Sequence, residues 1–183
     1  TYPADRLHAQ WSTNEKVSLD VAIGASFAGA RALAVMKHVG LNVAADALMS
    51  QTYIGVNGGL VLVVCDDPGI HSSQNEQDTR LYCRLSQVPC LEPSDAQEAL
   101  EFTRLAFDLS ERFDTPVIVR STTRLSHTRS PVKLGARQER KTGGFVENSN
   151  KNVMIPTNAR ARHPMLVKRE ADLRAYFNEA EIT

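Results

Sequence analysis

The chain has 183 residues and carries 21 Lys and Arg side chains against 21 Asp and Glu side chains, so its formal net charge is zero. This length is enough for one domain with a substantial core and an additional arm. Zero net charge argues against a nucleic-acid binder that relies on bulk positive charge. No apolar run approaches the roughly 20 residues that a membrane-spanning helix needs.

The cysteines indicate neither a metal site nor an iron–sulfur cluster within this chain. Cys65, Cys83 and Cys90 are odd in number and lack the spacing of metal ligands. We expect buried free thiols in a reducing compartment, which favours a cytoplasmic protein. Asp66 and Asp67 could suggest a metal site, but their place between a strand and Pro-Gly favours a turn-forming role.

The first predicted helix covers residues 13–29, and Glu15 stands near its start. Ser12 and Glu15 have the spacing of a capping box, in which Ser12 caps the helix and Glu15 bonds back to the Ser12 amide. The helix is rich in Ala, Gly and Ser, which favours close packing and deep burial. A carboxylate that enters a buried region also suits a proton-holding role. Both interpretations of Glu15, structural cap and functional group, stay open on this pattern.

Apolar segments separated by turn residues predict several strands. The segment 32–36 is apolar without alternation, as in a strand covered on both faces, and a polar loop at 37–42 follows it. The clearest strand is 60–65, which ends at the breaker Asp-Asp-Pro-Gly and leads into a polar loop. Further strands are predicted at 88–91 and 116–120.

Helical spacing of apolar residues predicts a helix that ends at Phe113 and starts with a cap at residues 94–97, and a second helix is expected at 43–52. The composition then turns polar. We therefore predict an α/β domain over residues 1–134, a linker or exposed loop at 135–152, and a C-terminal extension at 153–183. In that extension, Pro164 is placed at the first position of a terminal helix at 164–180.

Strands that alternate with helices predict an α/β fold with a doubly wound, mostly parallel sheet and helices on both faces. Ligands bind such sheets at the carboxyl ends of the strands. Here those ends lead into residues 37–42, 66–75 and 120–124, all of which are polar. We expect these three segments to share one edge of a binding site, with His38 and His71 as candidates for function.

Several sequence strings resemble the alpha subunits of indolepyruvate:ferredoxin oxidoreductases, within the thiamine-diphosphate-dependent 2-oxoacid:ferredoxin oxidoreductase family. The resemblance extends over nearly the whole chain from Trp11 onward. It is carried by residues 11–16, 36–46 and 66–78, and is supported by 91–95, 113–117 and 158–164. The matching portion of the family is its pyrimidine-binding domain, which has a doubly wound α/β fold.

The resemblance implies a role for particular residues. In thiamine enzymes a buried glutamate bonds to the aminopyrimidine ring and promotes loss of the thiazolium proton, which makes Glu15 the expected catalytic residue. Gly40 and Asn42 are expected to bind the cofactor with Glu15. The expected substrate-binding residues are those at the strand ends: Lys37, His38, His71, Gln74 and Asn75.

The family activity implied is oxidative decarboxylation of indolepyruvate or other aryl pyruvates to the acyl-coenzyme A, with reduction of ferredoxin. Thiamine diphosphate would be shared with a diphosphate-binding domain that holds magnesium, because the motif of that domain is missing here. Iron–sulfur clusters would lie elsewhere in the subunit. The chain opens at Thr1, and we expect a fragment or lone domain that is inactive alone.

The expected partners are that diphosphate-binding domain, a beta subunit, ferredoxin, coenzyme A and a second copy of this domain in a homodimer. Neither nucleic acid nor a membrane is expected as a partner. Two alternatives stay open: a non-catalytic interaction module of the same fold, and a paralogue that acts on another 2-oxoacid.

Overall fold

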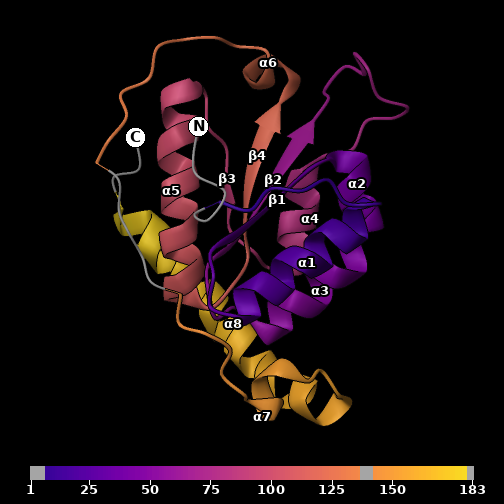
Figure 1. The fold of residues 1–183 in the computed structure, drawn as a ribbon, viewed down its shortest axis with the longest axis vertical. Helices are drawn as coiled ribbons and strands as arrows, with labels where there is room; N and C mark the ends of the chain where they lie inside the picture. The colour runs from indigo at the N-terminus through magenta and orange to yellow at the C-terminus, as the bar shows by residue number, and fades with distance from the viewer. Residues whose placement is uncertain (1–6, 137–141, 181–183) are drawn as a thin grey trace.

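The computed structural model describes residues 7–136 and 142–180, and its centre is a parallel sheet with the strand order β1-β2-β4-β3 (Figure 1). The strands are β1 (Ala32–Lys37), β2 (Leu60–Asp66), β3 (Cys90–Leu91) and β4 (Val117–Thr122). All three pairings are parallel. The predicted parallel α/β sheet is thus confirmed, and each predicted strand occurs close to its expected bounds.

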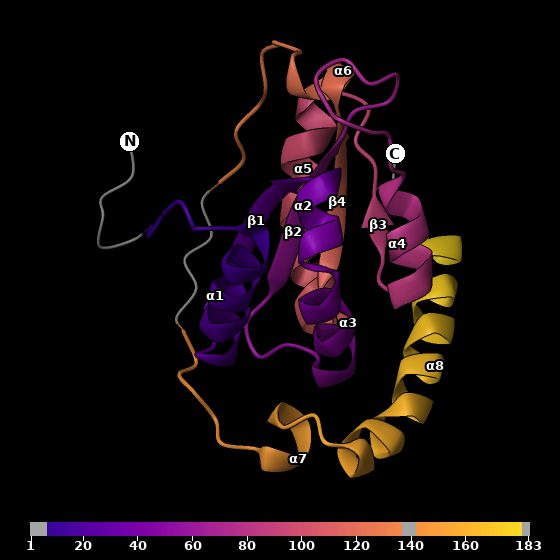
Figure 2. The same ribbon diagram turned by 90° about the vertical axis from the view of Figure 1, so that its right-hand side faces the viewer.

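Helices cover both faces of the sheet, as predicted (Figures 1 and 2). One face packs against the helices α1 (Glu15–Phe27), α2 (His38–Val43), α3 (Ala45–Ile54) and α4 (Thr79–Ser86), around a core that includes Leu19, Leu41, Leu48 and Leu62. The other face packs against α5 (Ala96–Phe113), which contributes Ala106 and Leu109 to a second core cluster with Val61 and Val117. The fold is therefore doubly wound.

Strand β1 differs from its prediction because the described residues cover only one of its faces. Ala32, Ala34 and Met36 are buried, whereas Leu33 is 42% exposed and Val35 is 58% exposed. Helix α5 packs over β2 and β4, while β1 lies at the edge of the sheet beyond that helix. The lack of alternation in segment 32–36 therefore indicated correctly that both faces of the strand are apolar. It did not indicate that the face with Leu33 and Val35 is exposed to solvent.

The start of α1 also differs from its prediction. The N-cap is Asn14, whose side-chain Oδ1 accepts a hydrogen bond from the Val17 amide at 2.9 Å. The expected cap by Ser12 and the return bond from Glu15 are therefore wrong, because Asn14 supplies the oxygen that the first turn needs. Glu15 is the first helical residue and is half-buried.

The segment 37–42 is not a loop as expected. Lys37 ends β1, and α2 begins directly at His38 and runs to Val43. Helix α3 follows after the single residue Ala44, so the predicted helix at 43–52 begins slightly later and ends at Ile54. The short connection places the first turn of α2 at the carboxyl end of β1.

The C-terminal part consists of α6 (Thr123–Ser126), α7 (Ser149–Asn152) and the long α8 (Pro156–Glu179). The expected helix start at Pro164 is wrong: Pro156 occupies the first turn of α8, and Pro164 lies inside that helix. The predicted linker falls partly on residues 137–141, outside the described residues. Its described remainder is exposed except for the half-buried Lys151 and Asn152 of α7. The division into three segments stays a prediction. No helix within 7–136 and 142–180 combines the length and apolarity needed to cross a membrane.

Candidate functional site

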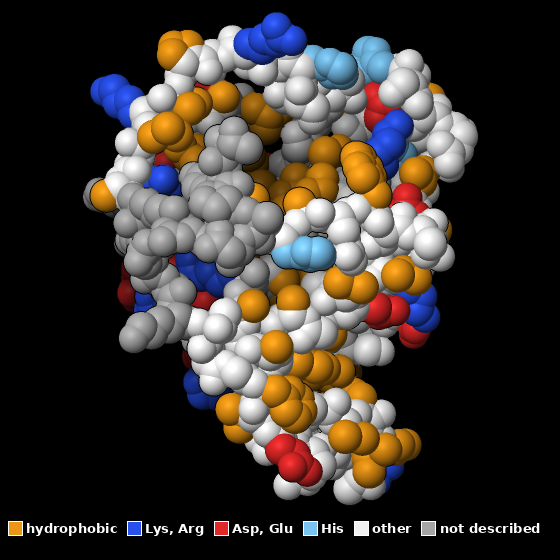
Figure 3. Space-filling view, in the orientation of Figure 1, with side chains coloured by type: hydrophobic (Ala, Val, Ile, Leu, Met, Phe, Trp, Pro, Cys, Tyr) orange, Lys and Arg blue, Asp and Glu red, His pale blue; other side chains and the backbone are white. Residues whose placement is uncertain are grey.

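The candidate site lies at the carboxyl edge of the sheet, where three strands end side by side. Lys37 of β1 pairs in register with Cys65 of β2, and Cys65 pairs with Ser121 of β4. The three strand ends that the sequence singled out therefore lie along one edge. Figure 3 shows hydrophobic side chains gathered in a hollow in the upper half of the molecule, toward which the strand arrows of Figure 1 point.

Glu15 and Gly40 are in direct contact. A Cβ atom built on Gly40 would lie 2.4 Å from Cγ and 3.0 Å from Oε1 of Glu15, distances at which the two residues would clash. Gly40 is buried in α2, and its bare backbone gives the Glu15 side chain the room to lie against that helix. The expected cofactor residues Glu15 and Gly40 are thus brought together from α1 and α2.

The Glu15 carboxylate has no hydrogen-bond or ion-pair partner among the described residues, and its half-buried position leaves it accessible. Asn14 caps α1, so the Glu15 carboxylate does not need to accept hydrogen bonds from the first turn of that helix. The amino end of α1 favours a negative charge at this position. A half-buried carboxylate against bare backbone fits the ring nitrogen of an aminopyrimidine, which needs a proton-sharing partner.

His38 faces inward, and both of its ring nitrogens lie close to backbone carbonyl oxygens. The residue is only 1% exposed. Its Nε2 atom lies 3.1 Å from the Asn75 carbonyl oxygen, and its Nδ1 atom lies 3.5 Å from the Cys65 carbonyl oxygen. Both partners are carbonyl oxygens, which accept, so the tautomer of His38 determines which ring nitrogen donates. His38 therefore fastens the loop after β2 to the start of α2, and a direct contact with substrate stays a prediction.

The loop after β2 carries the other candidates. His71, Gln74 and Asn75 are exposed on it, and the Lys37 Nζ atom donates to the Ser72 carbonyl oxygen at 3.2 Å. Asn42 is also exposed and donates from Nδ2 to Gln77 Oε1 at 3.4 Å. The structure thus brings Lys37, His38 and the loop together. It places the side chains of His71, Gln74 and Asn75 where solvent or a ligand can reach them.

Asp67 holds this loop in place. Its carboxylate accepts hydrogen bonds from the Ser72 amide at 2.8 Å, the Thr123 Oγ1 at 2.7 Å and the His71 amide at 3.1 Å. The bond from the Ser72 amide contributes most to lowering the pKa of Asp67 well below its ordinary value, and the Thr123 hydroxyl adds to this effect. Within the described residues, no group of three His, Cys, Asp or Glu side chains is arranged to hold a metal ion.

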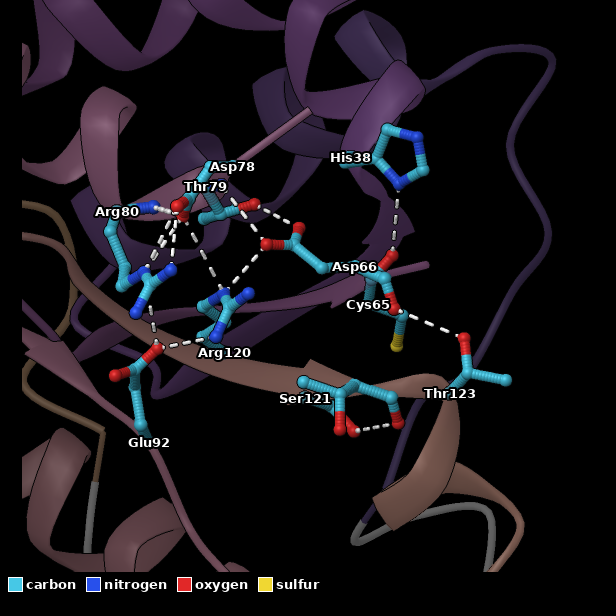
Figure 4. A network of polar contacts seen from close by, with 11 residues as sticks. His38, Cys65, Asp66, Asp78, Thr79, Arg80, Glu92, Arg120, Ser121 and Thr123 are labelled. Atoms are coloured by element: carbon cyan, nitrogen blue, oxygen red, sulfur yellow. Dashed lines mark hydrogen bonds and ion pairs between the residues drawn. The ribbon is translucent and has the colours of Figure 1, made fainter. Parts of the chain in front are cut away.

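Sequence reasoning missed a second element of the site, the charged network that surrounds Asp66 (Figure 4). The buried Asp66 carboxylate accepts from Arg120 Nε at 2.6 Å and from the Thr79 amide at 3.0 Å, as well as from the Thr79 hydroxyl. Arg120 also donates to Glu92 at 2.6 Å. Burial opposes the charge of Arg120, but Asp66 and Glu92 outweigh that penalty and raise its pKa above the ordinary value.

A detectable signal did exist for this network. Asp66 and Arg120 are ionisable residues at the carboxyl ends of two otherwise apolar segments, and such ends meet when parallel strands pair. The network joins the end of β2 to the start of α4 and thereby fixes both ends of the loop at 67–78. The Asp66–Arg120 pair is largely buried beneath the loop at 67–78, so it stabilises the candidate site without forming its exposed surface.

Comparison with known proteins identifies the family of this chain. The family described as pyruvate flavodoxin/ferredoxin oxidoreductase, thiamine diphosphate-binding, matches residues 7–182. The chain belongs to this family. The "Indolepyruvate oxidoreductase subunit IorA" of Archaeoglobus fulgidus is 48% identical over 96% of this chain, and that of Pyrococcus horikoshii is 47% identical over 94% of it. The chain spans 28% of the length of each of these two relatives.

A solved structure supports the fold independently. The 2-oxoglutarate:ferredoxin oxidoreductase from Magnetococcus marinus superimposes with a TM-score of 0.63, covering 90% of this chain and 36% of that chain. Its sequence is only 15% identical, so this similarity shows the α/β fold alone. Family membership and fold thus agree with the resemblance recognised in the sequence, while the roles of individual residues stay predictions.

Proposed function

We propose that this chain is the pyrimidine-binding portion of a thiamine-diphosphate-dependent enzyme that oxidatively decarboxylates indolepyruvate to the acyl-coenzyme A and reduces ferredoxin. Membership in a thiamine-diphosphate-binding family and 45–48% identity to indolepyruvate oxidoreductase subunits support this proposal. The observation that carries it is the contact of the accessible Glu15 carboxylate with the bare backbone of Gly40.

In this proposal Glu15 shares a proton with the ring nitrogen of the cofactor, and Gly40 keeps the space that the ring and carboxylate need. When bound, thiamine diphosphate supplies the nucleophilic carbon that attacks a 2-oxo group and takes up the electrons left by loss of carbon dioxide. The diphosphate and its magnesium ion would be held by a separate domain, and iron–sulfur clusters elsewhere in the enzyme would pass electrons to ferredoxin. Asn42 at the end of α2 completes the proposed cofactor contacts.

The test of the cofactor role uses the full-length subunit in its complete enzyme. Glu15→Gln keeps the size of the side chain and removes its charge, and we expect activity with indolepyruvate, coenzyme A and ferredoxin to fall about 100-fold or more. Thiamine diphosphate affinity, measured by calorimetry, is expected to fall in parallel. Asp20→Asn, on an exposed position of the same helix, is the matched control. Unchanged activity and affinity in Glu15→Gln would refute the assignment.

We further propose that Lys37 and the loop side chains His71, Gln74 and Asn75 form the substrate-facing edge, with the buried His38 beneath them. His71, Gln74 and Asn75 are exposed on a loop whose backbone is fixed by Asp67 and His38. His71→Ala should raise KM for indolepyruvate with a smaller effect on kcat, because it removes binding made equally in ground and transition states. The exposed His8→Ala is the control, and an equal KM for both variants would exclude His71 from substrate binding.

The open face of β1 supports a proposed interface in the assembled enzyme. Leu33 and Val35 are exposed side by side on an edge strand, an arrangement that proteins usually cover. We propose that a second copy of this domain covers this face, forming a homodimer of the domain within a cytoplasmic assembly that also includes a beta subunit. Leu33→Lys with Val35→Lys should convert the dimer to a monomer in light scattering, whereas Leu81→Lys on α4 should not. A dimer that survives the double substitution would contradict this interface.

A further inference from the structure

A second cavity lies away from the carboxyl edge of the sheet. It is open to solvent, has a volume of about 380 Å³ and is lined by α4, β3 and the C-terminal half of α8. Its apolar walls include Val88, Leu173 and Phe177, and Arg84 lies at its margin. None of these residues has a part in the proposed function.

Two thiols share the wall of this cavity. Cys83 of α4 is 5% exposed, Cys90 of β3 is half-buried, and both line the cavity. Helix α4 ends at Ser86, and its C-cap residue Gln87, whose φ is 57°, turns the chain back. The Val88 amide then donates to the Cys83 carbonyl oxygen at 3.1 Å. This turn returns the chain alongside the helix, so that both thiol side chains line the same hollow.

Burial distinguishes the two thiols, because Cys83 is buried and Cys90 is only half-buried. The hydrogen bond with Cys90 is the main cause that raises the pKa of the Cys83 thiol, and burial of Cys83 adds to it. Cys83 therefore keeps its proton, while the more exposed Cys90 is the thiol that a small molecule in the cavity reaches first. This division resembles the attacking and resolving roles of a redox-active thiol pair.

We propose that Cys83 and Cys90 form a reversible dithiol–disulfide pair that reacts with small disulfides entering this cavity. The Cys90 thiolate attacks one sulfur of the disulfide, forms a mixed disulfide and releases one thiolate. Cys83 loses its proton to that thiolate and attacks the Cys90 sulfur, which forms the internal disulfide and releases the second thiol. Two protein thiols are oxidised and one small disulfide is reduced to two thiols.

Closure of this disulfide would join α4 covalently to β3. Helix α4 begins at Thr79, which is bonded to Asp66 behind the candidate site. A reducing thiol in excess would reopen the bond by the reverse exchange. The pair therefore gives this domain an oxidisable position that is separate from the candidate cofactor residues.

The test is incubation of the folded protein, at its full natural length, with oxidised glutathione, followed by alkylation of free thiols and tryptic mapping. Trypsin places Cys83 on the peptide 81–84 and Cys90 on the peptide 85–104, while Cys65 lies on 38–80. We expect the first two peptides to be linked with the loss of two hydrogens and to separate on addition of dithiothreitol. Cys65 is the internal control and should remain alkylated.

Single substitutions determine the order of the steps. Cys83→Ser should stop at a glutathione adduct on Cys90, and Cys90→Ser should leave Cys83 unmodified in the folded protein. Unfolding in urea before oxidation controls for pairing that depends only on the short separation in sequence, and the folded protein should form the bond faster. The proposal is overturned if the folded protein retains both thiols, if it accumulates only the Cys90 adduct, or if unfolding does not slow the pairing.

Discussion

The Nε atom of Arg120 on β4 lies 2.6 Å from the Asp66 carboxylate on β2, and the Asp66 side chain is only 1% exposed. The side chain of Arg120 is 11% exposed and also reaches Glu92. Removal of one partner from an enclosed ion pair leaves the other charge without compensation, and that loss costs more than the pair itself contributes.

We therefore expect Asp66→Asn to lower the free energy of unfolding by about 2–3 kcal/mol, somewhat less than the roughly 3–5 kcal/mol typical of buried pairs, since Arg120 keeps Glu92. Urea denaturation followed by circular dichroism measures this change. Asp172→Asn, which breaks the exposed Lys168–Asp172 pair on α8, is the matched control and should change little. Equal effects of the two substitutions would show that the Asp66 network contributes no more than a surface pair.

Gly40→Ala provides a direct test of the cofactor niche. The added Cβ would lie 2.4 Å from Glu15 Cγ, so the Glu15 side chain has to move away from α2. We expect thiamine diphosphate affinity in the complete enzyme to fall at least tenfold, with a smaller change in thermal stability because Glu15 is partly exposed.

Gly24→Ala is the control for this substitution. Gly24 lies inside α1, and a Cβ there would meet nothing within 4 Å. This variant should be as stable as the wild type or more stable by up to about 1 kcal/mol, because Ala favours the helix. If both variants bind the cofactor with wild-type affinity, the contact between Glu15 and Gly40 has no role in binding.

The sequence predicted the architecture well and the local contacts poorly, for identifiable reasons. Apolar runs and turn residues were sufficient to predict the strands and α5, because burial on a sheet determines both. Asn14 and Ser12 are both good caps, and only the path of the chain selects Asn14. Pairing of Asp66 with Arg120 depends on strand order, which periodicity does not encode.

For the candidate site too, the sequence predicted which segments are neighbours but not the contacts of individual side chains. The strand ends that carry Lys37 and His38 were predicted correctly as neighbours of the loop after β2. The inward direction of the His38 ring was not predicted, because it depends on carbonyl groups supplied by Cys65 and Asn75. The loop-fixing role of Asp67 was predicted only as a general tendency of Asp before Pro-Gly to form turns.

Asp67 predicts a specific pH dependence. Its pKa is lower in the folded chain than in the unfolded chain, chiefly because the Ser72 amide bonds to the ionised form. A lowered carboxyl pKa contributes stability that is complete above the unfolded value, about 4, and is lost as the pH falls toward the folded value. Unfolding free energy should therefore decrease below pH about 4, and the decrease should be smaller in Asp67→Asn.

The measurement is urea denaturation at a series of pH values for both proteins. Asp95→Asn is the control, because this residue caps α5 with a single backbone bond and Asn caps helices equally well. Its pH profile should follow the wild type more closely than that of Asp67→Asn. Superimposable profiles for wild type and Asp67→Asn would show that the loop bonds do not depend on this ionisation.

Asp114 makes a prediction for the C-terminal arm, because it joins that arm to the sheet domain. Its carboxylate accepts hydrogen bonds from the Val56 amide at 2.8 Å, Lys151 Nζ at 2.8 Å and Arg162 Nη2 at 3.1 Å. Its backbone φ is 52°, a left-handed conformation that Asn also tolerates, so Asp114→Asn removes the charge with little backbone strain.

We expect Asp114→Asn to loosen α7 and α8 while the sheet stays folded. Hydrogen–deuterium exchange should increase in residues 149–179 and change little in β2 and β4, because Lys151 and Arg162 each lose their carboxylate partner. Glu170→Gln removes an exposed pair with Arg174 from the same helix and serves as the control. If exchange in α8 rises equally in both variants, the arm is held by its apolar contacts through Leu166 and Leu173 and Asp114 is not its anchor.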